Sequence, residues 1–109
     1  MPSLKLRSSQ WIVDEQGRTI IGKGRMEILE HIEKTGSINQ AAKRMKMSYK
    51  AVWSKIKASE KHFGTTLVHT DRCKGSHLSP EGRALVEKFK RLQQRCRRAD
   101  DDIFAEIFE

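Results

Sequence analysis

Apolar residues recur at helical spacing in four stretches of the 109-residue chain, and serine, glycine or proline stands at the ends of these stretches. The first stretch predicts a helix over residues 25–34, which Gly36 ends. Its apolar positions are Met26, Leu29 and Ile32. Ser37 predicts the N-cap of a second helix, and Gln40 three residues later completes a reciprocal capping box. The pattern therefore predicts two short helices in close succession.

The second and third predicted helices are separated by a tight turn. The apolar positions of the second helix are Ile38, Ala41, Ala42 and Met45. The two alanines are small, so another helix can cross this face closely. Lys46 and Met47 predict the turn, and Ser48 caps a third helix that Gly64 ends. A short helix followed by a longer one across such a turn is typical of a helix-turn-helix.

The third predicted helix has two different faces. The apolar face, which we expect to pack on the core, comprises Val52, Trp53, Ile56 and Phe63, with Tyr49 at its edge. The opposite face offers ammonium groups and a hydroxyl from Lys50, Ser54, Lys57 and Lys61. For Tyr49 and Trp53, packing in the core and contact with a ligand both stay open.

Short β elements flank the three helices. Alternating apolar residues predict an antiparallel hairpin over residues 4–21, around the turn Asp14–Gly17. Residues 67–70 and 77–78 predict two more strands around a polar loop, so that residues 67–78 form a wing. The sequence therefore predicts a mainly α fold with small β elements, a winged helix-turn-helix with helices over residues 25–64.

A long final helix is predicted over residues 80–108. Ser79 supplies its N-cap and Pro80 its first residue. Its apolar residues form a heptad seam, which we expect to dimerise the protein: Leu85, Phe89, Leu92, Cys96, Ala99 and Ile103. Alternatively, the first turns of the seam pack on the core of the same chain. No linker is visible, so we expect a single domain over residues 1–109.

The charge is unevenly distributed. The formal net charge is +8, from 22 Lys and Arg against 14 Asp and Glu. Residues 43–74 hold nine basic and two acidic residues, whereas the last ten residues hold five acidic residues and no basic one. A concentrated basic block favours a polyanionic partner, and here the expected partner is double-stranded DNA.

Other classes of function find little support. There is no glycine-rich phosphate loop and no pair of carboxylates in a pocket-forming context, so we expect no enzyme. His69, Cys73 and His77 are spaced four apart around the wing, but this spacing suits a metal site on a helix better than one on a ribbon. We therefore expect no metal and no cofactor.

The cysteine content and hydropathy indicate the compartment. Cys73 and Cys96 are too few for a disulfide framework, and neither a signal peptide nor an apolar run near 18 residues is present. We expect a cytoplasmic, nucleoid-associated protein with free thiols and no membrane contact.

The predicted recognition surface follows from the chemistry of DNA. Lys50 and Ser54 lie near the start of the third helix, where side chains reach base edges, and Tyr49 can contact a phosphate, a sugar or a thymine methyl group. Phosphate contacts are expected at the two helix starts, farther along the third helix and in the wing, from Ser37, Asn39, Gln40, Ser48, Lys57, Lys61, Arg72 and Lys74.

Four segments resemble the N-terminal domain of the prokaryotic ModE family of molybdate-responsive regulators. They are residues 37–42, 47–53, 67–68 and 78–82, and the Ser48, Tyr49, Lys50 and Trp53 pattern is the most specific. The framework of Ala51, Val52, Ile56, Gly64 and Leu67 also resembles LysR-type DNA-binding domains. The resemblance implies a winged helix-turn-helix that dimerises through its long terminal helix. It also implies that the helix after Ser48 is the recognition helix, with DNA contacts from Ser48, Tyr49, Lys50, Trp53 and Ser54.

The sequence thus favours a homodimeric, sequence-specific transcription regulator on a palindromic operator, with half-sites roughly 34 Å apart. The chain stops at Glu109, so we expect no oxyanion-binding domain and no inherited molybdate or tungstate sensing. A separate sensor protein is a possible partner. Two alternatives stay open: a winged-helix interaction module or adaptor without direct DNA readout, and a binder of structured RNA.

Overall fold

The structure, a computed structural model, describes residues 2–109. Its elements follow in the order β1 (Trp11–Val13), β2 (Thr19–Gly22), α1 (Lys23–Thr35), α2 (Ile38–Met45), α3 (Tyr49–Phe63), β3 (Val68–Asp71), β4 (Gly75–Leu78) and α4 (Pro80–Phe108). The two pairs of strands are separate antiparallel hairpins. This architecture confirms the mainly α, winged helix-turn-helix prediction.

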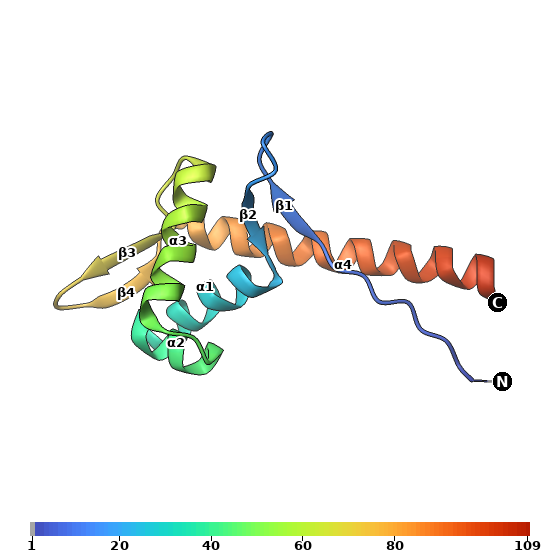
Figure 1. The fold of residues 1–109 in the computed structure, drawn as a ribbon, viewed down its shortest axis with the longest axis horizontal. Coiled ribbons are helices and arrows are strands. Elements are labelled where there is room, and N and C mark those ends of the chain that lie inside the picture. The colour runs from blue at the N-terminus through green and yellow to red at the C-terminus, as the bar shows by residue number, and fades with distance from the viewer. Residues whose placement is uncertain (1) are drawn as a thin grey trace.

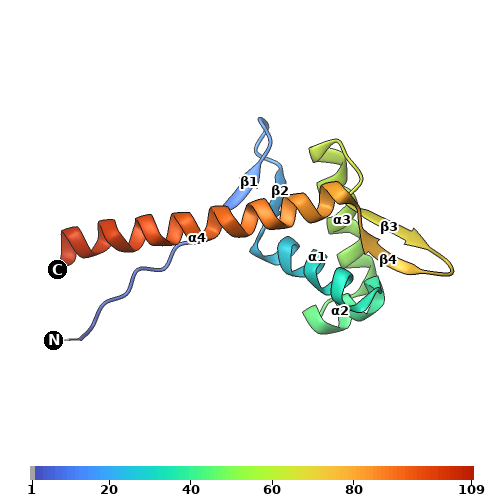
Figure 2. The same cartoon turned by 180° about the vertical axis from the view of Figure 1, so that it is seen from behind.

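The elements form a body at one end of a long helix (Figure 1). Helix α1 and strand β4 pack against the first half of α4, and α2 packs on α1 and α3. The second half of α4 extends away from this body and ends near the N-terminal segment of the chain (Figures 1 and 2). The β3–β4 wing projects at the opposite end of the molecule. No helix within residues 2–109 is both long and apolar enough to cross a bilayer.

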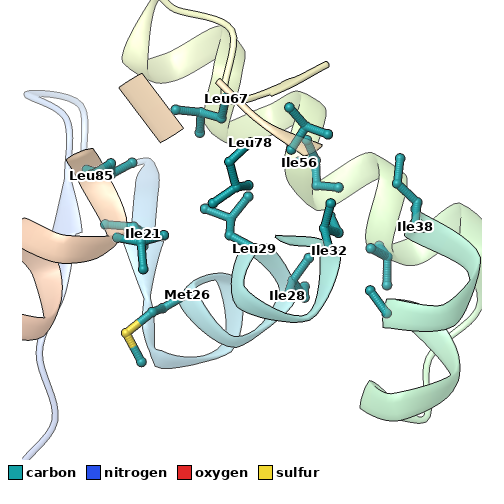
Figure 3. Packing of buried hydrophobic residues seen from close by; sticks show 14 of the residues in the cluster. Ile21, Met26, Ile28, Leu29, Ile32, Ile38, Ile56, Leu67, Leu78 and Leu85 are labelled. Atoms are coloured by element: carbon teal, nitrogen blue, oxygen red, sulfur yellow. The ribbon is translucent and has the colours of Figure 1, made fainter. Parts of the chain in front are cut away.

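Helix α1 supplies the centre of the hydrophobic core. Its residues Ile28, Leu29 and Ile32 are almost completely buried. Figure 3 shows Ile56 of α3 and Leu78 of β4 converging on this helix. Each buried leucine or isoleucine side chain contributes about 1.5–3 kcal/mol. The helical pattern that predicted burial of α1 was therefore correct.

The predicted N-terminal hairpin is shorter than expected. Strands β1 and β2 pair over residues 11–13 and 19–22, whereas residues 4–10 form no strand. Strand β2 is only four residues long and already paired by β1, so the backbone of residues 4–10 has no strand beside it. Instead, this segment runs along the end of α4, where Ser8 Oγ donates a hydrogen bond to Asp100 Oδ2 at 2.7 Å.

The turn of the β1–β2 hairpin is built on Asp14. Its Oδ1 accepts the backbone N–H groups of Gln16 and Arg18, each at 2.9 Å, and its Oδ2 pairs with Arg18 Nε at 2.7 Å. Desolvation by itself raises the pKa of Asp14, but these hydrogen bonds and the guanidinium charge outweigh it, so the pKa lies below its usual value. The turn is therefore favoured by the ionised carboxylate.

The predicted capping box is only half formed. Ser37 Oγ accepts the N–H of Gln40 at 3.1 Å, as expected. The N–H of Ser37, however, donates to Thr35 Oγ1 at 3.3 Å and not to the Gln40 side chain. Thr35 lies only two residues from Ser37 and accepts this N–H in place of the Gln40 side chain. Gln40 therefore remains exposed and free to contact a ligand.

The wing is fastened to the body through close backbone contacts. Ser79 N–H donates to Leu67 O, and the Ser79 hydroxyl both donates to Thr66 O and accepts from Gly82 N–H. A Cβ atom at Gly82 would lie well inside the van der Waals contact distance from Leu67 O. The junction between α4 and the wing therefore requires glycine at this position.

Replacing Gly82 by alanine should destabilise the protein by about 1–3 kcal/mol, because the new methyl group forces α4 away from the wing. Urea denaturation followed by circular dichroism measures this destabilisation. Gly24→Ala is the matched control, since it also lies in the first turn of a helix but has open space around its Cβ position. Equal stabilities of the two variants would contradict the close contact at Gly82.

Candidate nucleic-acid interface

The rotation of α3 decides which residues form the candidate interface. Val52, Ile56 and Ser59 are buried against the body. The other side is exposed and carries Lys50, Ser54, Lys57 and Lys61. The structure therefore brings these predicted contact residues onto one open side, which we call the basic face.

Two aromatic residues do not lie where the apolar pattern placed them. Phe63 is 45% exposed, so the expectation that it packs in the core is wrong. Trp53, for which core packing and ligand contact both stayed open, is 44% exposed. Trp53 follows Val52 directly, and a step of about 100° around the helix carries it out of the core to the edge of the basic face. Phe63 lies in the last turn of α3 and lines a surface pocket with Ala84 and Leu85 of α4. Tyr49, which was left open, is 50% exposed.

The starts of α2 and α3 also face solvent. Asn39 and Gln40 are exposed in the first turn of α2, behind the Ser37 cap. Ser48 caps α3 by accepting the N–H of Ala51 at 3.0 Å. Neither helix has an acidic residue in its first turn, so the positive ends of both helix dipoles are not neutralised there. Both ends suit a phosphate group.

The wing carries the remaining predicted contacts. Arg72 and Lys74 are exposed in the turn between β3 and β4. Asp71 shapes this turn, since its Oδ1 accepts the N–H groups of Cys73 and Lys74 at 2.7 and 3.2 Å. The wing extends beyond the body beside α3 (Figure 1). Arg72 and Lys74 can therefore contact parts of a bound ligand that extend beyond α3.

The possible metal ligands in the wing do not form a site. His69 and His77 pair across the two strands with ring centres 5.7 Å apart, while Cys73 lies at the exposed tip. Within residues 2–109, no three side chains of the His, Cys, Asp and Glu types gather so that they can hold a metal ion. The histidines are therefore cross-strand neighbours on the ribbon.

The predicted dimerisation seam divides into two parts. Leu85 and Phe89 belong to the core of the chain, and Phe89 is 1% exposed. From the next position onward the seam opens, with Leu92 at 40% and Ile103 at 53% exposed. Cys96 is half-buried and Ala99 is exposed. Leu85 and Phe89 therefore do not offer a free surface to another molecule, whereas the later positions do.

Comparison with known proteins identifies this arrangement. Residues 24–83, more than half of the chain, match the bacterial regulatory helix-turn-helix proteins of the lysR family. The chain belongs to the lysR family. It is a DNA-binding transcription regulator domain of this type and not an enzyme.

Two curated relatives are ModE proteins. The chain is 33% identical over 85 residues to the molybdenum transport protein ModE of Azotobacter vinelandii, a match that covers 74% of this chain and 32% of that protein. It is 44% identical over 46 residues to the transcriptional regulator ModE of Haemophilus influenzae, covering 42% of this chain and 18% of that protein. The chain thus spans a third or less of the length of these relatives.

A similar solved structure is the DNA-binding domain of CbnR in complex with DNA. It aligns with a TM-score of 0.62 at 23% identity, covering 76% of this chain and 94% of that one. At this identity the likeness establishes the fold alone. It supports the assignment of residues 38–63 as the helix-turn-helix.

Residues that the sequence did not single out position the lysR-type helices. Burial lowers the pKa of the Arg25 guanidinium, which donates to Thr19 O at 2.6 Å and to Ser59 Oγ at 2.9 Å. Arg25 therefore joins the β1–β2 hairpin, α1 and α3. One feature of the sequence could have indicated this contact: Ser59 is a polar residue seven positions after Val52, on the buried side of α3, where it needs a hydrogen-bond partner.

Further exposed cations surround the interface. Lys43 and Arg44 are exposed at the end of α2, and Lys46 is exposed in the turn with a left-handed φ of 56°. The sequence counted them in the basic block but assigned them no contact. They gave no common helical signal, because Lys43 and Arg44 lie in the last turn of α2 whereas Lys46 lies in the turn that follows.

Substitutions at Ser48 should separate capping from DNA contact. Ser48→Ala removes the cap and should lower stability by about 1 kcal/mol, whereas Ser48→Asp keeps an acceptor for the Ala51 N–H and should retain stability. The carboxylate of Ser48→Asp should nevertheless weaken duplex binding, because it repels a phosphate at the helix start. Urea denaturation and fluorescence-anisotropy titration measure the two effects. Wild-type DNA affinity in Ser48→Asp would show that no phosphate approaches this helix end.

Proposed function

We propose that the protein binds double-stranded DNA sequence-specifically as a homodimer on a palindromic operator and thereby regulates transcription. The observation that carries this proposal is the basic face of α3. Its lysines are open to solvent, while Val52 and Ile56 fix the opposite side of the same helix in the core. A rigid helix that presents cations on one side suits insertion into a major groove.

The position along α3 suggests separate roles for its polar residues. Lys50 and Ser54 lie in the first two turns, the part of a recognition helix that reaches base edges. A lysine can donate to guanine O6 and N7, and a hydroxyl can serve either type of base pair. Lys61 lies near the end of α3 and suits a phosphate, as do Ser37, Asn39, Gln40, Arg72 and Lys74.

The open part of the α4 seam supports dimerisation. Leu92, Cys96, Ala99 and Ile103 form this part. The second half of α4 extends beyond the body with only the N-terminal segment beside it, and its exposed leucine and isoleucine gain stability by burial against a second copy. The occupant we propose is α4 of a second copy of the chain.

The charges beside the seam favour an antiparallel pair. With Cys96 packed against Ala99 of the partner copy, heptad geometry places Arg95 opposite Asp102 and Lys88 opposite Glu109 of the partner copy. Both contacts join opposite charges. A parallel pair places Arg95 opposite Asp100 but Lys88 opposite the neutral Gln93, and it brings the two basic bodies together. The antiparallel arrangement therefore pairs the charges beside the seam better than the parallel one.

This dimer would address two half-sites roughly one helical turn, or a multiple of it, apart. We further propose that a separate sensor or effector protein acts on the dimer. The proposed location is the cytoplasm, on the nucleoid, because that is where the operator DNA of a bacterial regulator lies.

Alanine substitution of Lys50 and Lys61 should distinguish base contact from phosphate contact. Lys50→Ala should relax sequence preference at one position per half-site, at a cost of about 1–3 kcal/mol for the preferred duplex. Lys61→Ala should weaken all duplexes alike and reduce the slope of log affinity against log salt by about 0.9 for each phosphate that the lysine neutralises. Fluorescence-anisotropy titrations at several salt concentrations measure both.

The same titrations can contradict the proposed roles of Lys50 and Lys61 and the proposed function. Identical behaviour of the two variants would remove the division of roles. Affinity that does not change with salt, or equal affinity for structured RNA, would overturn duplex recognition itself. Function retained by the Lys50→Ala, Lys57→Ala double variant would favour the interaction-module alternative.

Charge exchange tests the orientation of the dimer. Arg95→Asp and Asp102→Arg should each weaken association by about 1–2 kcal/mol across the two symmetric contacts, and the double variant should recover it. Analytical ultracentrifugation measures the dissociation constant. Ile103→Asp should abolish the dimer, whereas Arg91→Gln, on another face of α4, should leave it unchanged. A double variant that remains as weak as the single ones would exclude the antiparallel register.

A further inference from the structure

Three residues of α3 form a stripe along one side of the helix. Trp53, Lys57 and Glu60 lie at i, i+4 and i+7, so their side chains follow one another along the helix axis. Lys57 Nζ lies 5.6 Å from the centre of the Trp53 ring, within the range of a cation–π interaction. The same Nζ lies 3.3 Å from Glu60 Oε1. Lys57 therefore joins an exposed indole to a carboxylate.

The carboxylate end of the stripe is fixed to the start of the wing. Only 12% of the Glu60 side chain is exposed. Its Oε2 accepts the backbone N–H groups of Leu67 and Val68 at 2.8 and 3.2 Å. These hydrogen bonds hold the end of α3 against β3. Glu60 is therefore held in place and orients the ammonium group of Lys57, which in turn contacts the Trp53 ring.

The exposure of Trp53 requires a further explanation. The indole is the largest apolar side chain, and here almost half of it is in water at the edge of the basic face. Cation–π contact covers only part of the ring. An indole offers an apolar face and a single N–H donor, and the C5-methyl group of thymine is the apolar group that a base pair presents in the major groove. The two surfaces match.

We propose that Trp53 recognises a thymine methyl group and that Lys57 and Glu60 are positioning residues that set the orientation of its ring. This inference rests on the proposed DNA-binding function and refines it. It also assigns Lys57 a different role from the phosphate contact that the sequence favoured. The Lys57 charge is directed to Glu60 and the indole, and both lie on the wing side of the face.

The experiment begins with a duplex selected from a random pool by the full wild-type chain. Each thymine of that duplex is then replaced by deoxyuridine, which removes only the methyl group. One position per half-site should bind about fourfold more weakly, since one buried methyl group is worth roughly 0.8 kcal/mol. Trp53→Ala should bind the thymine and deoxyuridine duplexes equally.

Variants of Lys57 separate positioning from phosphate contact. Lys57→Met keeps most of the apolar stem but removes the charge, so it should lose the thymine preference while the salt slope stays at the wild-type value. Lys57→Arg should retain the preference, because it restores a cation beside the ring. Glu60→Gln should reduce the preference in the same way as Lys57→Met, since it removes the charge that holds Nζ. Lys61→Met is the matched control and should change the salt slope but not the thymine preference.

The opposite results overturn the inference. A Lys57→Met variant with a lower salt slope and intact thymine preference would make Lys57 a phosphate contact. A wild-type protein that binds its selected duplex tightly but is insensitive to every deoxyuridine replacement, or whose half-site contains no thymine, would exclude methyl recognition and leave the proposed function standing. If no duplex is enriched at all, the proposed function fails as well.

Discussion

The rotational setting of α3 is the constraint on which the rest of this molecule depends. Val52 and Ile56 pack into the core formed by α1, and Arg25 holds Ser59 on the same side. Moving the helix by one position would turn it by about 100°, exposing these residues and directing lysines inward. Burial of an unpaired ammonium group is far more costly than the exposure of one apolar side chain. The packing that stabilises the body therefore also determines which side chains face a ligand.

Helix α1 transmits this setting to the other functional elements. Glu33 Oε2 accepts the N–H of Leu78 in the wing at 3.1 Å, and Glu33 Oε1 lies 3.4 Å from Arg83 of α4. A second ion pair joins Glu30 to Lys90 of α4. Surface ion pairs are individually weak, but here they flank a buried apolar contact and fix its direction. The wing, the basic face and the proposed dimer helix are thus oriented by one central helix.

The local signals in the sequence predicted element ends well because each has a short-range physical cause. Gly36 and Gly64 both adopt the left-handed conformation that ends a helix, and Ser48 and Ser79 cap the helices that follow them. The apolar pattern was less informative about α3. Helix period alone placed Trp53 and Phe63 on the apolar face of α3, whereas their exposure depends on how that helix packs against the rest of the fold. The strand predicted over residues 4–10 is absent for a related reason, because an alternating apolar pattern does not by itself supply a neighbouring strand to pair with.

The heptad seam of α4 shows the same limit and has a physical consequence. One uninterrupted apolar stripe supports the core of the chain as far as Phe89 and becomes an open surface at Leu92, a distance of one helical turn. Periodicity cannot reveal this change, because both uses require the same residues at the same spacing. The continuity also means that the proposed partner helix would pack directly beside the core. Association would then stabilise the first turns of α4 and, through Lys90 and Arg83, the position of α1. DNA affinity and dimer formation are therefore expected to be coupled through this one helix, beyond the simple gain from binding two half-sites at once.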